Sequence, residues 1–229
     1  MKNILKELPQ KNLSGRLKFT TENFIDTHDI SGKKILNIGC GYGWFEFWAA
    51  KNKVGKIIGI EIDDKNLETA RSLSDKRIQF AIGDAIKIPL KNKTFDTVTS
   101  WEVLEHIPKN TEIQMFCEAN RVLKSKGVFY ISTPNSTFWS KVLDPAWWLI
   151  GHRHYSIKDI KYYAINSGFI VKKIEIKGGW WEMLSMLNLY FSKWVLRRKP
   201  LFFKWFERNK NIEYKKHGWS NIFVKMEKS

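Results

Sequence analysis

The sequence predicts an α/β fold in which a mostly parallel β-sheet is covered by helices on both faces. Short apolar segments alternate with amphipathic segments along the chain, a pattern typical of right-handed βαβ units. A glycine-rich loop, 39–43, follows the first apolar segment, and acidic residues follow others. Ligands of such sheets bind at the carboxyl ends of the strands, where the strand order reverses. We therefore expect a ligand site at that edge of the sheet.

In the first half of the chain, apolar segments predict strands at 33–39, 56–61, 78–82 and 95–101. Each segment is short and bounded by glycine or polar residues, as expected of buried strands. Apolar residues at helical spacing predict helices at 44–53 and 66–73. Residues 1–30 lack a strong period, but their apolar residues predict a helix that lies against the core.

The second half of the chain predicts the rest of the sheet and an additional aromatic segment. Strands are expected at 127–132, 169–176 and 220–226, and helices at 112–123 and 157–166. Between the last two strands, apolar residues recur at helical spacing until Pro200 breaks the pattern. These apolar residues are Trp180, Met183, Leu184, Leu187, Phe191 and Trp194.

The composition is that of a globular protein of 229 residues, with 43% hydrophobic and 27% charged residues. No apolar run reaches the ~20 residues of a membrane-spanning helix. The polar start, 1–13, predicts no secretory signal. The two cysteines, Cys40 and Cys117, exclude a disulfide framework and a cysteine-rich zinc site. We expect a cytoplasmic protein.

The net charge of +16 is unevenly distributed along the chain. Residues 190–229 hold eleven Lys or Arg against three Glu, so half of the net charge lies there. A basic surface favours nucleic acid, anionic membranes or acidic substrates. A solvated lysine-rich surface is the alternative, and charge alone does not decide between these interpretations.

Two acids follow later strands at positions suited to a nucleoside. Glu61 ends the second strand, 18 residues after Gly43, where a carboxylate can accept hydrogen bonds from both ribose hydroxyls. Asp84 follows the third strand and can accept a hydrogen bond from an adenine amino group. The glycine spacing of 39–43 differs from the fingerprint of nicotinamide dinucleotide sites. The sequence therefore favours a nucleoside without a pyrophosphate.

From about residue 33 to residue 169 the chain resembles the class I S-adenosylmethionine-dependent methyltransferases. The resemblance rests on the first motif, 37–43, on Glu61, on the pair Phe95-Asp96 and on the segment 121–124. It implies a Rossmann-like, seven-stranded, mostly parallel sheet whose last strand is antiparallel, with a helical aromatic insert before that strand. It also implies S-adenosyl-L-methionine as the cofactor. The residues assigned to cofactor binding are Asn37, Gly39, Cys40, Gly41, Gly43, Glu61, Ile62, Asp84, Ala85 and Trp101.

Asn37 departs from the family pattern, in which an acid is commonest at this position. We expect its amide oxygen still to accept a hydrogen bond from the cofactor's amino group. The resemblance also divides the chain into regions of a single domain, 1–229. These are an N-terminal helical cap (1–30), a cofactor-binding core (31–135), an acceptor-side cap and insert (136–218) and the last strand (219–229).

The reaction implied is transfer of a methyl group from a sulfonium to an O, N, C or S atom. We expect a small or lipid-linked acceptor that is methylated at oxygen, such as a quinone, polyprenyl or glycolipid precursor. One alternative is an RNA methyltransferase, including a Mg²⁺-assisted 2′-O type, which the net charge favours. A non-catalytic module that binds S-adenosylmethionine is the other.

A hydroxyl acceptor would be helped by a general base, and histidines are the candidates. His106 lies just beyond the expected cofactor site, and His152 and His154 lie before the 157–166 helix. We take His106 and His154 as the catalytic candidates. A capping or surface role is the alternative for each of them.

The sequence Glu102-x-x-Glu105-His106 also suggests a metal site. Its two carboxylates and imidazole could share one divalent cation, completed by His152 or His154, and would suit Mg²⁺ or Mn²⁺. The pattern is similar to the metal site of ubiquinone-pathway O-methyltransferases and small-RNA 2′-O-methyltransferases. The alternative is the first turn of a helix, where the acids face the macrodipole.

The aromatic basic insert, 180–206, predicts a lid over an apolar acceptor that contacts an anionic membrane surface. Packing of the aromatic stripe on its own domain is the commonest alternative. Stacking of nucleic-acid bases in a cationic groove is another, and it is less favoured because the aromatic residues follow amphipathic spacing.

Overall fold

The computed structural model describes residues 13–71 and 75–229. Parts of two sequence predictions lie outside these residues. They are the beginning of the N-terminal cap and the end of the helix predicted at 66–73.

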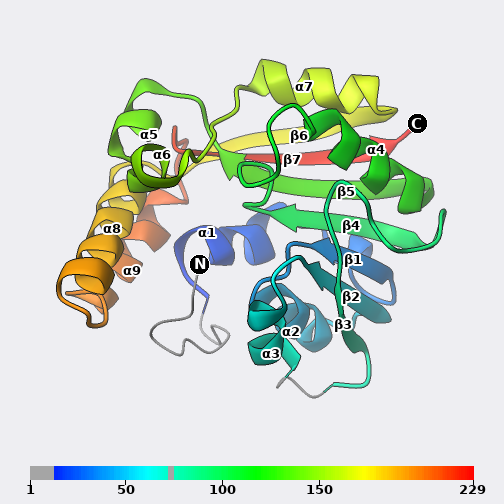
Figure 1. The fold of residues 1–229 in the computed structure, drawn as a ribbon, viewed down its shortest axis with the longest axis horizontal. Coiled ribbons are helices and arrows are strands. Elements are labelled where there is room, and N and C mark those ends of the chain that lie inside the picture. The colour runs from blue at the N-terminus through cyan, green and yellow to red at the C-terminus, as the bar shows by residue number, and fades with distance from the viewer. Residues whose placement is uncertain (1–12, 72–74) are drawn as a thin grey trace.

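The described chain contains one seven-stranded sheet with the order β3-β2-β1-β4-β5-β7-β6 (Figure 1). β7 runs antiparallel to both of its neighbours, and the remaining pairs are parallel. This confirms the predicted mostly parallel sheet with an antiparallel last strand. The strands are β1 Lys34–Ile38, β2 Lys56–Glu61, β3 Ile78–Ile82, β4 Phe95–Trp101, β5 Leu123–Pro134, β6 Phe169–Lys177 and β7 Asn221–Lys228.

The strand order reverses between β1 and β4, because β2 and β3 extend the sheet to one side of β1 while β4 and β5 extend it to the other. The loops that follow β1, β2, β4 and β5 all leave from the carboxyl ends of their strands, which lie together on the left side of the sheet in Figure 1. This side is called the carboxyl edge of the sheet. The fold thus brings together segments that are far apart in the sequence, at the place where ligands of such sheets bind.

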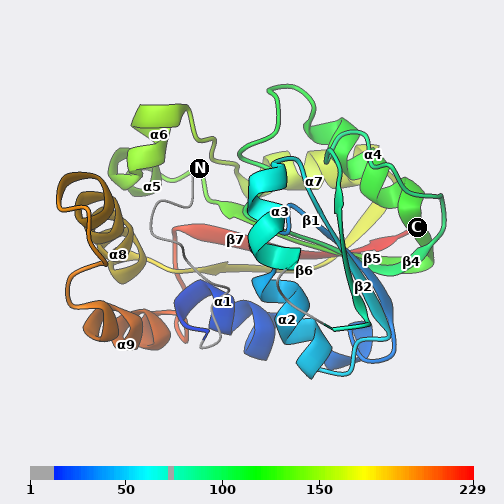
Figure 2. The same cartoon turned by 60° about the horizontal axis from the view of Figure 1, so that its bottom comes forward.

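Helices cover both faces of the sheet. α4 and α7 lie on one face, whereas α1 and α2 lie on the other (Figure 2). Shorter helical turns are present at Thr20–Phe24, Thr27–Asp29 and Phe191–Val195. The helices are α1 Gly15–Phe19, α2 Trp44–Lys51, α3 Asp64–Arg71, α4 Glu112–Val122, α5 Phe138–Leu143, α6 Pro145–Ile150, α7 Ile157–Asn166, α8 Trp180–Tyr190 and α9 Phe203–Glu213.

Each face of the sheet has its own hydrophobic core, because successive side chains of a strand point to opposite faces. On β1, Ile35 packs in the core that includes Phe45 of α2. Leu36 and Ile38 pack in the core that includes Phe116 of α4. Side chains of the single strand β1 therefore pack against helices on both faces of the sheet.

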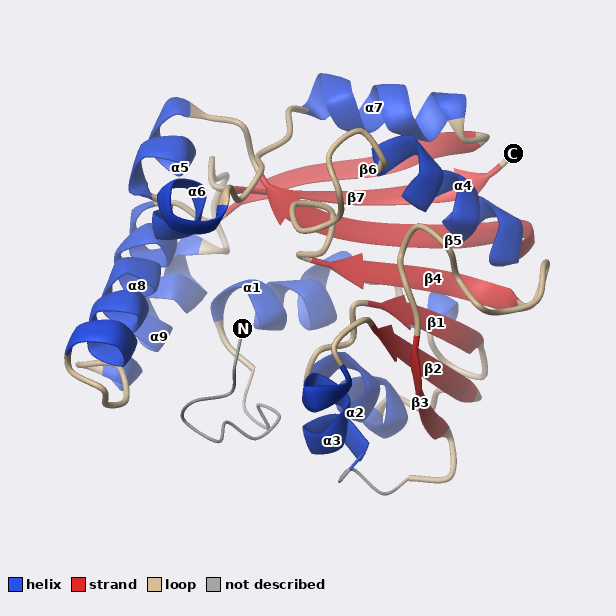
Figure 3. Ribbon diagram, viewed as in Figure 1, coloured by secondary structure: helices blue, strands red, loops and turns tan. Residues whose placement is uncertain are grey.

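The elements beyond the strand ends are helical (Figure 3). α5, α6, α8 and α9 form a cap at the edge where the ligand site is expected, and α1 lies beside α9. Within the described residues, no helix is both long and apolar enough to cross a membrane.

Candidate functional site

The glycine loop after β1 has the conformation that its sequence predicts. Gly39, Gly41 and Gly43 all have φ in the left-handed region, at +68°, +51° and +81°. A Cβ on Gly39 would lie 2.3 Å from a methyl carbon of Val103, whereas a Cβ on Gly41 would meet nothing within 4 Å. Gly39 is therefore required for close packing, and Gly41 leaves open space over the loop for a ligand.

The Glu61 carboxylate joins the ends of β1 and β2. Its Oε2 accepts a hydrogen bond from the Gly41 N–H at 3.0 Å, and its Oε1 accepts one from the Ile62 N–H at 2.9 Å. Ile62 is 69% exposed, so an apolar side chain lies open beside this carboxylate. The carboxylate, the glycine backbone and the apolar side chain fit a nucleoside.

The turn after β3 places a second acid at the same edge. β3 pairs in parallel with β2, so residue 82 lies opposite Glu61. Asp84 is partly exposed, and its Oδ1 accepts a hydrogen bond from the Ile86 N–H at 3.0 Å. Ala85 beside it is buried. The two acids predicted from sequence therefore come from neighbouring strand ends.

Asn37 and Cys40, both among the residues assigned to cofactor binding, have buried side chains. The Asn37 side chain is 1% exposed; its Nδ2 donates to Glu46 Oε1, and its Oδ1 accepts from the Thr99 hydroxyl, both at 2.8 Å. It lies on the α2 side of the sheet because it alternates with Leu36 and Ile38. In this structure Thr99 donates to the Asn37 amide oxygen, and the contact of that oxygen with the cofactor's amino group stays a prediction. The Cys40 side chain is also buried, so Cys40 can offer only its backbone to a ligand.

Trp101, at the end of β4, is 7% exposed and belongs to the core on the α2 side. Its ring packs against Phe45, with a centroid separation of 5.7 Å, and against Tyr130 at 6.4 Å. Its indole N–H is buried and has no hydrogen-bond partner among the described residues. An unpaired buried donor at this edge is a group that a polar ligand could satisfy.

Glu102 anchors the loop that follows β4. Its Oε1 accepts a hydrogen bond from the Ser132 hydroxyl at 2.6 Å, and its Oε2 accepts one from Arg16 at 2.8 Å. Both oxygens are thus engaged, and Glu102 is not among the residues whose ligand atoms lie within 4.8 Å of one another in the possible metal cluster of this loop. The residues after it form turns, and α4 begins only at Glu112. The alternative that these acids cap a helix is therefore wrong as well.

Glu105, His106 and His152 form one of two clusters among the described residues that could hold a metal ion, the other being Asp26, His28 and Asp29. In each cluster, one potential ligand atom from each residue lies within 4.8 Å of the others. The first cluster is the predicted pair of residues 105 and 106, completed by His152 in place of Glu102. Two imidazoles and one carboxylate suit zinc better than Mg²⁺, which prefers oxygen ligands. The donor set therefore does not fit the predicted Mg²⁺.

The Glu105 carboxyl group is buried within the loop between β4 and α4. Its Oε2 accepts a hydrogen bond from the Thr133 hydroxyl at 3.1 Å, and its Oε1 has no hydrogen-bond partner among the described residues. Burial, with the nearby charge of Glu102, raises the pKa of Glu105 well above its usual value. His152 Nε2 lies 3.7 Å from Oε1.

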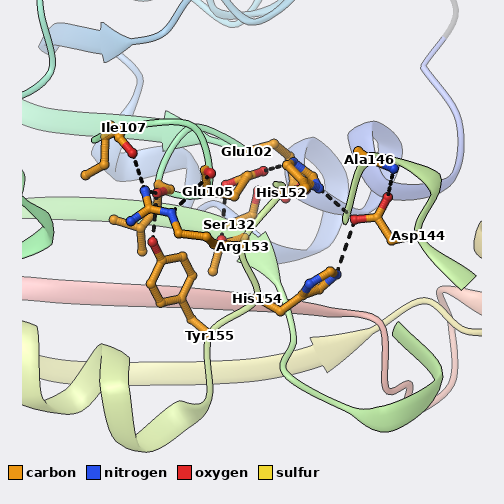
Figure 4. Close-up of polar contacts among 12 residues, drawn as sticks. Glu102, Glu105, Ile107, Ser132, Asp144, Ala146, His152, Arg153, His154 and Tyr155 are labelled. Atoms are coloured by element: carbon orange, nitrogen blue, oxygen red, sulfur yellow. Dashed lines mark hydrogen bonds and ion pairs between the residues drawn. The ribbon is translucent and has the colours of Figure 1, made fainter. Parts of the chain in front are cut away.

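Asp144 orients two histidines (Figure 4). Its Oδ2 lies 2.7 Å from His152 Nδ1 and 3.3 Å from His154 Nε2. Burial alone would raise the pKa of Asp144, but the hydrogen bonds from the two histidines outweigh it and lower the pKa well below its usual value. The His154 side chain is 1% exposed. His154 therefore supports Asp144 from inside the fold, and His152 is the histidine of this pair nearer the loop.

Arg153 holds the loop between β4 and α4 in place. Its guanidinium donates hydrogen bonds to the backbone carbonyls of Leu104, at 2.9 Å, and of Ile107, and it forms an ion pair with Glu112 (Figure 4). The Tyr155 hydroxyl donates to the Leu104 carbonyl as well, at 3.0 Å. The position of Glu105 and His106 thus depends on residues about 50 positions later.

Sequence reasoning missed Arg16, Asp144 and Arg153 as parts of this site. Asp144 carries one local signal, because it precedes Pro145 and caps α6 by accepting from the Ala146 N–H. That signal indicates a helix start and nothing about His152. The contacts of these three residues with the site become visible only in the tertiary fold.

Comparisons with known proteins find similar sequences and a similar fold. Residues 36–131 match the family model described as methyltransferase domain. The chain is 30% identical over 121 residues to a ubiquinone biosynthesis O-methyltransferase from Neisseria meningitidis, covering 49% of each chain. It is 33% identical over 144 residues to the human mitochondrial ubiquinone biosynthesis O-methyltransferase, covering 56% of this chain and 38% of that one. The matches span less than half the length of these two relatives.

A solved structure with a similar fold is an S-adenosylmethionine-dependent methyltransferase from Mesorhizobium loti. It has a TM-score of 0.61 and 18% identity, and the match covers 87% of this chain and 93% of that one. The family match covers β1 to β5 and includes the glycine loop, Glu61 and Asp84. Residues 36–131 are therefore similar in sequence to the methyltransferase domain, and the described chain shares the fold of the S-adenosylmethionine-dependent methyltransferase from Mesorhizobium loti.

Proposed function

We propose that this chain binds S-adenosylmethionine over the 39–43 loop and transfers its methyl group to an oxygen of a small or lipid-linked acceptor. The observation that carries the proposal is the Glu61 carboxylate, which bonds to the Gly41 N–H beside open space. Glu61 would hold the ribose, Ile62 and Asp84 would lie at the adenine, and the glycine backbone would face the rest. S-adenosylmethionine supplies an electrophilic methyl group on a sulfonium.

Oxygen is favoured as the acceptor atom because the site contains an oriented imidazole. Asp144 lies at His152 Nδ1, so a proton on Nδ1 leaves the lone pair of Nε2 free on the side of Glu105 and His106. A hydroxyl acceptor loses its proton as it is methylated, and His152 Nε2 can take that proton. This assigns the base to His152, with His106 beside it at a ring separation of 4.7 Å. It gives buried His154 a positioning role.

The aromatic cap supports an apolar, lipid-linked acceptor. Trp180, at the start of α8, lies 5.3 Å from Trp139 and 5.3 Å from Trp219 between ring centroids, and it remains 49% exposed. The names of the relatives from Neisseria meningitidis and human mitochondria refer to O-methylation in ubiquinone biosynthesis. A quinone or polyprenyl precursor is therefore the first acceptor class to test.

RNA is the second candidate acceptor, because the net charge is +16 and half of it lies in residues 190–229. Transfer of a labelled methyl group to a prenylated phenol or to RNA distinguishes the two. RNA methylation that falls steeply with salt would favour the second candidate.

The cofactor site is tested by calorimetric titration with S-adenosylhomocysteine. Glu61→Gln is expected to weaken binding about 10- to 100-fold, because a hydrogen bond to a charged group contributes roughly 1.5–3 kcal/mol. Asp64→Asn is the matched control, since Asp64 is 57% exposed and pairs with Arg71 at the surface. Equal affinities of the two variants would place the cofactor elsewhere.

A further inference from the structure

The end of the α8–α9 hairpin exposes large apolar side chains. Here the hairpin tip means residues 191–205, which connect α8 to α9 and begin α9. The hairpin projects beyond the strand ends, and its tip lies far from the sheet in both views (Figures 1 and 2). The exposed fractions are 51% for Phe191, 47% for Trp194, 65% for Val195, 40% for Leu196, 77% for Phe202, 50% for Phe203 and 52% for Trp205.

The tip is held in this shape by polar groups buried inside it. Ser192 is fully buried, and its hydroxyl accepts a hydrogen bond from the Leu201 N–H at 3.3 Å. Asn188 Nδ2 donates to the Leu201 carbonyl at 2.6 Å, and the Arg198 N–H donates to the Ser192 carbonyl at 3.0 Å. Phe202 has φ of +49°, a conformation that bulky residues rarely adopt. Asn188 and Ser192 thus point into the hairpin, and the turn around Phe202 leaves the apolar side chains on the outside.

The charged residues within the segment 183–206 are all basic. Residues 183–206 contain five Lys or Arg and no Asp or Glu. Arg197, Arg198 and Lys199 are exposed and follow directly after Val195 and Leu196. No carboxylate of this segment can neutralise these cations, so the tip combines an apolar surface with a basic one. Anionic lipid headgroups over an apolar layer have the complementary chemistry.

We propose that the hairpin tip docks on the surface of a bilayer that contains anionic lipids. The aliphatic Val195 and Leu196 and the aromatic Phe202 enter the interface, while Arg197 and Arg198 pair with the headgroups. Single-stranded nucleic acid uses aromatic residues as base platforms but has no use for exposed aliphatic side chains. Docking would bring the cap, and with it the catalytic edge, close to the membrane. The proposal does not depend on methyl transfer.

Co-sedimentation of the full chain with vesicles tests the proposal. Vesicles of phosphatidylcholine with or without 30 mol% phosphatidylglycerol are mixed with the wild type and with a tip variant, Val195→Ser/Phe202→Ser. The matched control, Tyr162→Ser/Ile165→Ser, changes residues of α7 that are 57% and 70% exposed on another part of the molecule. We expect the tip variant to lose at least tenfold in apparent affinity for anionic vesicles and the control to stay within twofold.

A charge variant separates the basic contribution from the apolar one. Arg197→Gln/Arg198→Gln is expected to reduce binding to anionic vesicles severalfold, and Lys158→Gln/Lys161→Gln on α7 is its control. Melting curves of all variants establish that they fold.

Three results would overturn the proposal. They are equal co-sedimentation of tip and control variants, no wild-type binding to anionic vesicles, or selective loss of oligonucleotide binding by the tip variant with vesicle binding unchanged. The last result would assign the tip to nucleic acid. None of these measurements involves the cofactor or an acceptor, so failure here leaves the proposed function untouched.

Discussion

Arg153→Met is predicted to unfold the protein at a lower temperature and to loosen the loop between β4 and α4. The Arg153 side chain is 20% exposed and that of Glu112 is 9% exposed, so the substitution leaves a largely buried carboxylate without its cationic partner and with only the Tyr155 hydroxyl, at 3.0 Å, as a side-chain donor. Removing one partner of a buried pair costs about 3–5 kcal/mol, and partial exposure places this case near 3 kcal/mol. For a chain of this size, that corresponds to a fall in melting temperature of about 6–12 °C.

Thermal unfolding of the variant and a matched control measures this effect. Arg71→Met is the control, because Arg71 is 46% exposed and pairs with Asp64 at 2.9 Å on the surface. Such exposed pairs contribute about 0–1 kcal/mol. The Arg153 variant should also show a reduced kcat, since the loop it holds carries Glu105. Similar melting temperatures for the two variants would refute the argument that Arg153 anchors the loop.

Two further predictions concern the glycine loop and its support. Burial raises the pKa of Glu46 to about 7, so the folded protein binds a proton that the unfolded chain releases near pH 4.5. Stability should therefore fall by on the order of 3 kcal/mol between about pH 4.5 and pH 7, and denaturant unfolding of Glu46→Gln should lack this slope. A parallel pH dependence in both proteins would contradict this. Gly39→Ala should weaken S-adenosylhomocysteine binding more than Gly32→Ala, measured by calorimetry. Both positions have positive φ, but an added Cβ meets Val103 only at Gly39. Equal losses would show that backbone strain alone matters.

The sequence alone predicted the cofactor edge because its signals are local. The 39–43 loop needs glycine for its left-handed backbone, and Glu61 follows the next apolar run directly. Once strand and helix alternate, chain chirality and the parallel sheet place both at the same edge. The alternation of strands and helices, together with the family resemblance, was enough to predict the sheet and its antiparallel last strand, and the structure confirms both.

The roles of individual buried side chains could not be predicted in this way. Asn37 lies in the motif that we expect to bind the cofactor, but strand alternation and α2 direct its side chain to Glu46. Trp101 follows the same alternation into the core. Glu102 is adjacent to the predicted metal ligands, but Arg16 and Ser132 engage both of its oxygens.

What the sequence by itself determined is the fold class, the glycine loop and the acids at the ends of β2 and β3, because backbone conformation and apolar period are encoded in neighbouring residues. Only the tertiary structure decided how His106, Glu105, His152 and Asp144 converge, because two of them lie after β4 and two after β5. It also decided that the aromatic stripe of α8 is only partly covered by its own domain. Met183 is buried and Trp180 contacts Trp139 and Trp219, whereas Phe191 and Trp194 are 51% and 47% exposed. Helical spacing identifies an apolar face, but the presence or absence of a neighbouring surface determines whether that face is covered.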